Sequence, residues 1–311
     1  MRFKKYIKAT IVLAFTIGLW VLLFSKANLA NIINVIHEAD FRTILLCLAL
    51  STVGNIFIAA YRWKVVLVQL GVPMSFKESL LIKMGSNVII GFLPFRSGEA
   101  SRLLYLTRVK NSSYVKASLS ILIEYLIKIL LLLSCTLLGL MTYFFHVLNL
   151  KTFENSSLRP AFYCLLGFSS CEFFRNKFGG SWLIIFKDCF REVLAILRNK
   201  EVLFYTTLIL GLEMANFYLL SKALSMNLPL YALLTFAPLA ILLGSLPVTV
   251  AGLGTREAAT LFLFARFSSS EILVSLGILV FFVDHLFPLM VGLLVTGRFV
   301  SRIVEGEEEA S

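Results

Sequence analysis

The sequence is poor in charged residues. Asp, Glu, Lys and Arg make up only 15% of its 311 residues, whereas hydrophobic residues make up 59%. Soluble globular domains are about a quarter charged. Since no uninterrupted polar stretch is long enough to fold into a soluble catalytic domain, the composition predicts a chain that consists almost entirely of membrane spans.

Sequence patterns for metals, redox centres and nucleotides are also lacking. The five cysteines match no zinc or disulfide spacing, and no Walker-type glycine-rich loop is present. The three histidines, His37, His146 and His285, are too dispersed for a metal-binding pattern. We therefore expect no cofactor, no metal and no hydrolysis of ATP.

Positive charge is in excess, with a net charge of +11. Because the Lys and Arg residues lie between the apolar runs, we attribute the excess to the positive-inside rule and expect no nucleic-acid partner. Lys4, Lys5 and Lys8 precede the first apolar run, and Arg298 and Arg302 follow the last. This pattern predicts a multi-pass protein of the cell (inner or cytoplasmic) membrane with both termini in the cytoplasm. The first run resembles a signal peptide, but its length favours an uncleaved span.

The apolar runs predict an all-α polytopic membrane protein, with one integral-membrane domain over residues 1–311. We expect about six to eight transmembrane helices, together with two re-entrant broken segments in an inverted repeat. The expected spans cover residues 9–24, 43–60, 117–145, 160–174, 202–220 and 272–296, of which 160–174 is the weakest. The first half is about 1–146 and the second about 201–300. A connecting span and an amphipathic helix (160–198) join them, and an acidic tail follows at 303–311.

Two stretches of the chain are similar to each other. One reads GFLPFRSGEASR around Pro94, and the other reads GSLPVTVAGLGTREAA around Pro247. Each has a Leu-Pro step, then a glycine, an acid and a nearby arginine, and each follows an apolar run that is short or interrupted. Broken hydrophobic segments at matching places in two halves are typical of inverted-repeat transporters, in which they form the substrate site.

The span count sets the direction of each broken segment. The cleanest apolar piece of the first, residues 84–93, is about half the length needed to cross the hydrocarbon layer, so we expect it to re-enter from the cytoplasm. The second, between Pro229 and Pro247, should enter from outside. One miscounted span, most simply the weak one at 160–174, would make the repeats parallel instead.

Together with AAYRWKVVL at the end of the second span, the twin stretches resemble the flippase-like transmembrane region of lysylphosphatidylglycerol synthases. The resemblance covers most of the chain and implies movement of a lipid or lipid-linked molecule between leaflets. Because the aminoacyl-transfer domain of those synthases is absent, we do not expect synthase activity. Matched by position, the two motifs fall on Pro94, Arg96, Gly98, Glu99 and Arg102, and on Pro247, Gly252, Gly254, Arg256 and Glu257.

The charged residues of the twin motifs are the candidate headgroup site: Arg96, Glu99, Arg102, Arg256 and Glu257. An arginine fork suits a phosphate, and a helix that starts after each loop adds N–H donors. The alternative is that Glu99–Arg102 and Arg256–Glu257 are ion pairs that only fix the loops. The proline and glycine positions Pro94, Gly98, Pro247, Gly252 and Gly254 are expected to form the loops.

Further charges lie inside the expected spans. Glu124 and Lys128 are one helical turn apart, which predicts an ion pair within the helix. Glu213, Asp284 and His285 are candidates for a proton relay, although hydrogen bonds between spans would also explain them.

Three functions are compatible with these patterns. The first is an ATP-independent flippase for a membrane lipid or lipid-linked, phosphate-bearing molecule. The second is a membrane-embedded enzyme that acts on a lipid carrier, for which Glu99 and Asp284 would be the acid–base pair. The third is a non-transporting scaffold for envelope biosynthesis that docks through residues 181–198. A homo-oligomer and an envelope-biosynthesis partner both remain open.

Overall fold

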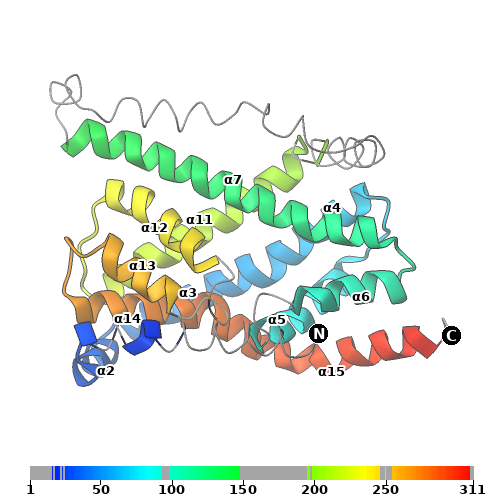
Figure 1. The fold of residues 1–311 in the computed structure, drawn as a ribbon, viewed down its shortest axis with the longest axis horizontal. Coiled ribbons are helices and arrows are strands. Elements are labelled where there is room, and N and C mark those ends of the chain that lie inside the picture. The colour runs from blue at the N-terminus through cyan, green and yellow to red at the C-terminus, as the bar shows by residue number, and fades with distance from the viewer. Residues whose placement is uncertain are drawn as a thin grey trace.

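The computed structural model describes residues 16–92 except 17, 22 and 24, residues 98–147, residues 195–245 except 197, residue 249 and residues 254–308. All regular elements in these ranges are helices, and the protein is an all-α polytopic membrane protein (Figure 1). Most of the expected first span, the weak span at 160–174 and most of the amphipathic helix at 181–198 lie outside the described residues.

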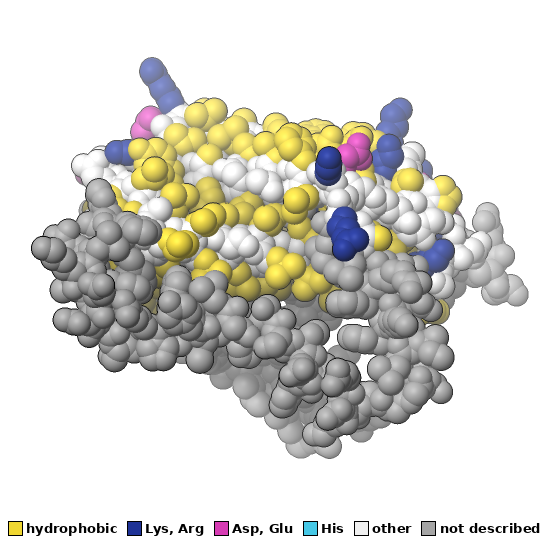
Figure 2. Space-filling model, turned by 90° about the horizontal axis from the view of Figure 1, so that it is seen from above, with side chains coloured by type: hydrophobic (Ala, Val, Ile, Leu, Met, Phe, Trp, Pro, Cys, Tyr) yellow, Lys and Arg dark blue, Asp and Glu magenta, His cyan; other side chains and the backbone are white. Residues whose placement is uncertain are grey.

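Four helices in the described part are long and apolar enough to cross a membrane. They cover Phe41–Gln69, Tyr114–Tyr143, Lys200–Ala223 and Ser270–Glu305. Each coincides with an expected span and begins two or three residues before it, because polar capping turns continue the helix beyond the apolar core. Asn199, for example, accepts hydrogen bonds from the backbone N–H groups of Glu201 and Val202 and so begins the third of them. Figure 2 shows hydrophobic side chains across the middle of one face, with Lys and Arg towards its two ends.

The described helices follow the same order in both halves: a long helix, two short helices and a second long helix. The short helix α2 (Leu29–His37) precedes them. In the first half, the first long helix consists of α3 (Phe41–Ser51), η1 (Thr52–Ile58) and α4 (Ala59–Gln69). The two short helices are α5 (Phe76–Phe92) and α6 (Ala100–Arg108), and the second long helix is α7 (Tyr114–Val147). In the second half, the first long helix is α11 (Lys200–Ala223), and the two short helices are α12 (Leu230–Ser245) and α13 (Thr255–Leu263). The second long helix consists of α14 (Ser270–Phe281), η4 (Phe282–Leu286) and α15 (Phe287–Glu308).

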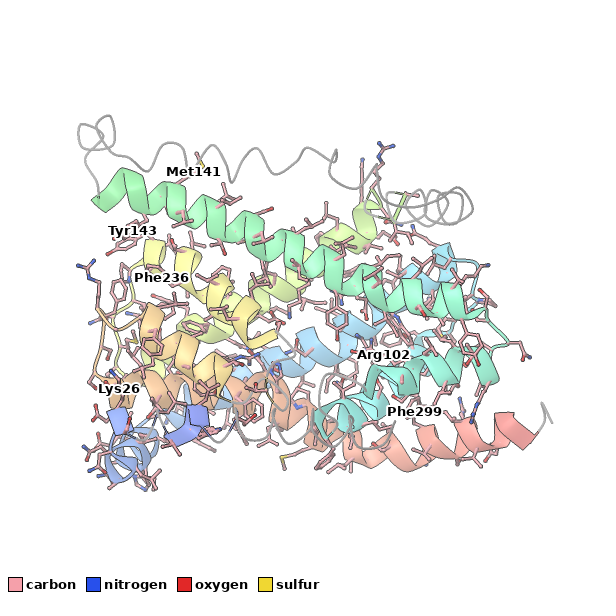
Figure 3. All side chains as sticks on the ribbon, viewed as in Figure 1. Lys26, Arg102, Met141, Tyr143, Phe236 and Phe299 are labelled. Carbon is pink, nitrogen blue, oxygen red and sulfur yellow. The ribbon has the colours of Figure 1, made fainter. Side chains whose placement is uncertain are left out.

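The first helix of each short pair packs on the last long helix of the other half, whereas α13 packs on α14 of its own half. Figure 1 shows the first helix pair (α5 and α6) at one end of the long axis and the second helix pair (α12 and α13) at the opposite end. Helix α5 packs against α15, and its last turn lies beside Leu289, near the middle of the final long helix. Helix α12 packs against α7 and extends from Tyr143 to Leu132, near the middle of that helix. Figure 3 shows Tyr143 and Phe236 between the two helices.

The first short helix is longer than its apolar core predicts. Helix α5 begins at Phe76 and not at residue 84, because Ser75 caps it by accepting a hydrogen bond from the backbone N–H of Glu78. Its 17 residues still fall short of the roughly 20 needed to cross a bilayer. The same is true of the 16 residues of α12.

The two long composite helices each contain a π-helical segment, and Ser51, the residue before the first segment, contacts the second. In η4 the backbone N–H of Phe287 donates five residues back, to the carbonyl of Phe282. In that register the carbonyl of Val283 would need the N–H of residue 288, which is a proline and has none. The hydroxyl of Ser51 donates to this carbonyl at 2.8 Å, so the first half satisfies a backbone group that the second half leaves open.

Candidate functional site

A buried charge cluster joins the first helix pair to the long helices. The Glu124 carboxylate, on α7, binds one cation from each of three other helices. The N···O distances are 2.8 Å to Arg62 on α4, 3.1 Å to Lys83 on α5 and 2.9 Å to Arg102 on α6. All four residues are buried. A single carboxylate thus fixes both short helices to the bundle, and we call this group, with Glu99, the Glu124 cluster.

Arg102 is the most fully engaged member of the Glu124 cluster. It also lies 3.1 Å from the Glu99 carboxylate, donates to the Ser86 hydroxyl at 3.1 Å and stacks over the Trp63 ring at 5.1 Å (Figure 3). The predicted Glu99–Arg102 pair is therefore present. Glu99 accepts a further hydrogen bond from the hydroxyl of Tyr125, so its two oxygens connect α6 to α7.

The charges of the Glu124 cluster do not cancel among the described residues. Three cations face two carboxylates, which leaves one excess positive charge inside the protein. Desolvation of an unbalanced charge costs several kcal/mol.

The predicted ion pair between Glu124 and Lys128 is wrong. Lys128 instead lies 2.7 Å from Glu213 on α11, because its side chain points to that helix while Glu124 points to the first helix pair. Spacing along α7 permits the intrahelical pair, but buried partners on other helices give shorter and more numerous contacts.

A second charge cluster lies around the π segment η4. Asp284 accepts a hydrogen bond from the Asn216 side-chain amide at 3.0 Å. Glu213, one turn before Asn216 on α11, is within electrostatic range of Asp284. With Lys128 and Arg256, these groups form what we call the Asp284 cluster. It brings together two of the three candidate relay residues, the buried Glu213 and the partly buried Asp284.

Arg256 binds the third candidate relay residue. Its two terminal guanidinium nitrogens lie 3.1 Å from the two ring nitrogens of His285. Arginine only donates, and a neutral imidazole has one bare nitrogen that can accept. At most one of the two contacts can therefore be a hydrogen bond, and it requires a neutral imidazole. A proton on His285 would remove the acceptor and place two cations together.

Glu257 serves the start of α13. It accepts a hydrogen bond from the backbone N–H of Gly254 at 2.7 Å, and Gly254 adopts the positive φ of +88° that glycine tolerates best. An ion pair between Arg256 and Glu257 is not among the contacts of the described residues; the two charges interact only over a longer range. The second loop is thus locked by a cap and not by the alternative ion pair considered from the sequence.

The structure places the motif residues in two separate groups. Gly98, Glu99 and Arg102 lie at the start of α6, and Gly254, Arg256 and Glu257 at the start of α13. The remaining candidates lie outside the described residues: Pro94, Arg96, Pro247 and Gly252. None of the described contacts joins the two groups directly, although α7 contributes Glu124 to one cluster and Lys128 to the other.

Sequence reasoning missed two cations of the Glu124 cluster. Arg62 follows an aromatic residue at the end of an apolar run, which favours an interfacial anchor, and Lys83 lies in a segment with other polar residues. The available signal was Lys83 itself, a lone charge five residues after Glu78 and directly before the apolar piece of α5.

Comparison with known proteins agrees with this architecture. The model of the family "Lysylphosphatidylglycerol synthase TM region" matches residues 10–292. The chain belongs to this family. No curated protein matches it. The membership confirms the resemblance drawn from the twin motifs, and it indicates a multi-pass membrane protein involved in the handling of lipid.

Proposed function

We propose that the protein moves a lipid or lipid-linked, phosphate-bearing molecule between the two leaflets without ATP. The observation that carries the proposal is that each half packs a short helix against a long helix of the other half. The first helix of each pair, α5 or α12, packs on the last long helix of the other half and ends near the middle of that helix. The two pairs lie at opposite ends of the molecule (Figure 1). Two elements of this kind let a midplane site open alternately to each side.

The charges support a phosphate-bearing substrate. Each helix pair has an arginine in the first turn of its second helix, Arg102 in α6 and Arg256 in α13, and both are buried. The excess positive charge of the Glu124 cluster would be balanced by a phosphate. We assign the protein no catalytic step.

Coupling to protons is a second part of the proposal. Glu213 and Asp284 are close together, and His285 holds Arg256 only while the imidazole is neutral. Protonation of His285 would release the guanidinium of Arg256 for a headgroup. A proton gradient would thus determine on which side of the membrane the guanidinium of Arg256 is free to bind a headgroup.

A leaflet-exchange assay tests the proposal. Purified protein is reconstituted into liposomes with a fluorescent phospholipid, and dithionite reduction from outside measures the inner-leaflet fraction over time. We expect Arg256→Gln to lower the exchange rate about tenfold or more, since a desolvated charge-assisted contact to phosphate is worth more than about 1.4 kcal/mol. The matched control is Arg266→Gln, an exposed arginine after the same short helix.

Two outcomes would overturn the proposal. Wild-type protein that exchanges lipid no faster than empty liposomes, across phospholipids with different headgroups, would remove the transport function. Equal rates for Arg256→Gln and Arg266→Gln would remove Arg256 from the headgroup site.

A further inference from the structure

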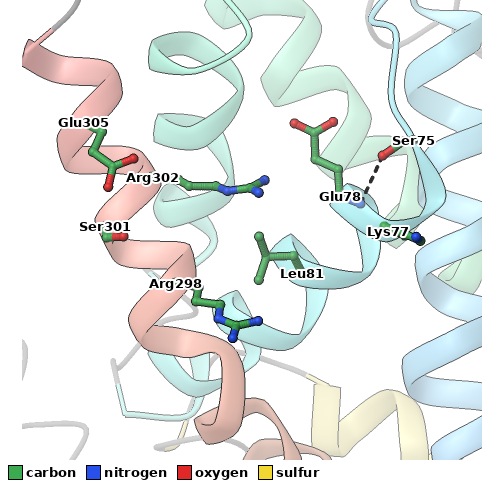
Figure 4. A pocket seen from close by; sticks show the side chains of 8 residues that line it. All are labelled: Ser75, Lys77, Glu78, Leu81, Arg298, Ser301, Arg302 and Glu305. Carbon is green, nitrogen blue, oxygen red and sulfur yellow. Dashed lines mark hydrogen bonds between the residues drawn. The ribbon is translucent and has the colours of Figure 1, made fainter.

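A groove opens at the end of the molecule where α5 begins and α15 ends. Its volume is about 610 Å³, and Figure 4 shows side chains of α15 extending across it towards the first turns of α5. The groove is separate from both charge clusters, because none of their residues lines it. Its polar side chains are largely exposed, and Leu81 adds an apolar side chain to the lining.

Two arginines one turn apart on α15 dominate the groove. Arg302 donates to the hydroxyl of Tyr105 on α6 at 3.5 Å, a contact that orients its guanidinium towards that helix. Arg298 lines the same groove, and no carboxylate in the described part of the chain lies within ion-pair distance of it. Two arginines at this spacing can contact one phosphate together.

The acids of the groove do not neutralise these arginines. Glu78 is engaged by Lys110 at 2.8 Å and by the hydroxyl of Tyr105 at 3.0 Å. Glu305 interacts with Arg302 only over a longer range. With Lys77 also on its lining, the groove has an excess of positive charge that an anion would balance.

The depth of the groove favours a lipid over a soluble anion. Counted from the middle of Ser270–Glu305 at about 1.5 Å per residue, Arg298 lies about 16 Å from the centre of the span, close to the edge of the hydrocarbon layer at about 15 Å. Leu294, one turn deeper on the same face, is 83% exposed and is available to an acyl chain. Arg302, one turn further out, reaches the headgroup region.

We propose that this groove binds the phosphate of a phospholipid from the surrounding leaflet, with Arg298 and Arg302 on the phosphate and Leu294 beside an acyl chain. The site is peripheral and does not depend on the proposed transport. It would hold an anionic lipid beside the first turns of α5, the helix that supplies Lys83 to the Glu124 cluster.

Native mass spectrometry of the detergent-solubilised protein tests the site. The full chain is titrated with dioleoylphosphatidic acid, and the Kd of the first bound lipid is determined. We expect the double variant Arg298→Ala/Arg302→Ala to weaken this Kd about tenfold, and Glu305→Gln to strengthen it about twofold. The matched control is Arg198→Ala/Lys200→Ala, which removes two exposed cations from the start of α11.

The probes separate the sources of the phosphate. Dioleoylglycerol, which has the same acyl chains and no phosphate, should not bind with comparable affinity, and millimolar inorganic phosphate should not displace the lipid. Displacement by inorganic phosphate would overturn the assignment to a lipid. An unchanged Kd in the arginine double variant, or an equal loss in the control, would overturn the site altogether.

Discussion

The two helix pairs occupy equivalent places in the fold but treat their arginines differently. In the first pair, Arg102 contacts two carboxylates, Glu99 and Glu124. In the second pair, Arg256 contacts the imidazole ring of His285, and the nearby acid Asp284 accepts a hydrogen bond from the Asn216 amide. Equivalent backbone positions can therefore serve different purposes. The first pair is fixed by ion pairs, whereas no ion pair of the second pair is among the described contacts.

The largest effect should come from the carboxylate that fixes the first pair. Glu124→Gln removes the carboxylate charge that Arg62 and Lys83 contact and one of the two that Arg102 contacts. Loss of a buried charge partner costs about 3–5 kcal/mol of stability. We expect a large drop in the thermal unfolding midpoint in detergent. Glu201→Gln, at the exposed start of α11, is the control and should change it little. Equal midpoints for the two variants would show that the first pair is not fixed by this cluster.

The second pair depends on close backbone packing and not on ion pairs. Pro238 lacks an N–H and leaves the carbonyl of Leu234 without its helical donor, and Gly139 on α7 packs directly against that carbonyl. A Cβ at Gly139 would lie 2.5 Å from this oxygen. Gly139→Ala should therefore separate α7 from α12 and cost about 1–3 kcal/mol.

The same substitution elsewhere provides the control for Gly139. A Cβ at Gly211 on α11 would meet nothing within 4 Å, so Gly211→Ala should be neutral or stabilise the helix by up to about 1 kcal/mol. Thermal unfolding of both variants under identical conditions measures the difference. A destabilisation of Gly211→Ala as large as that of Gly139→Ala would contradict the close packing.

The smallest effect on stability should follow from Asp284→Asn. This acid has no ion pair within 4 Å among the described contacts, and an amide can keep one hydrogen bond with Asn216, so we expect a loss of about 1 kcal/mol or less. The substitution should instead change function. If Asp284 relays protons, the rate of lipid exchange should depend less on pH in the variant than in the wild type, while the variant stays folded. A variant with the wild-type pH profile would remove Asp284 from the relay.

The sequence was sufficient to predict the all-α membrane fold class and the family, but not which buried side chains contact one another. Apolar runs and the twin Leu-Pro stretches locate the long helices and both helix pairs, because hydrophobic length and helix-breaking residues are local properties. The partner of Glu124 is not local: Arg62, Lys83 and Arg102 are 62, 41 and 22 positions away, and the intrahelical alternative Lys128 had the better spacing. The contact of Ser51 with Val283, 232 positions apart, has no sequence signal beyond Pro288.

The central claim, that the two helix pairs enter from opposite sides of the membrane, is tested most directly by cysteine accessibility. In a cysteine-free background, Ser75→Cys before α5 and Asn227→Cys before α12 place single thiols at exposed positions. A membrane-impermeant maleimide is applied to sealed right-side-out and inside-out vesicles. We predict that Asn227→Cys is labelled in right-side-out vesicles and Ser75→Cys in inside-out vesicles. Labelling of both from the same side would contradict the inverted arrangement.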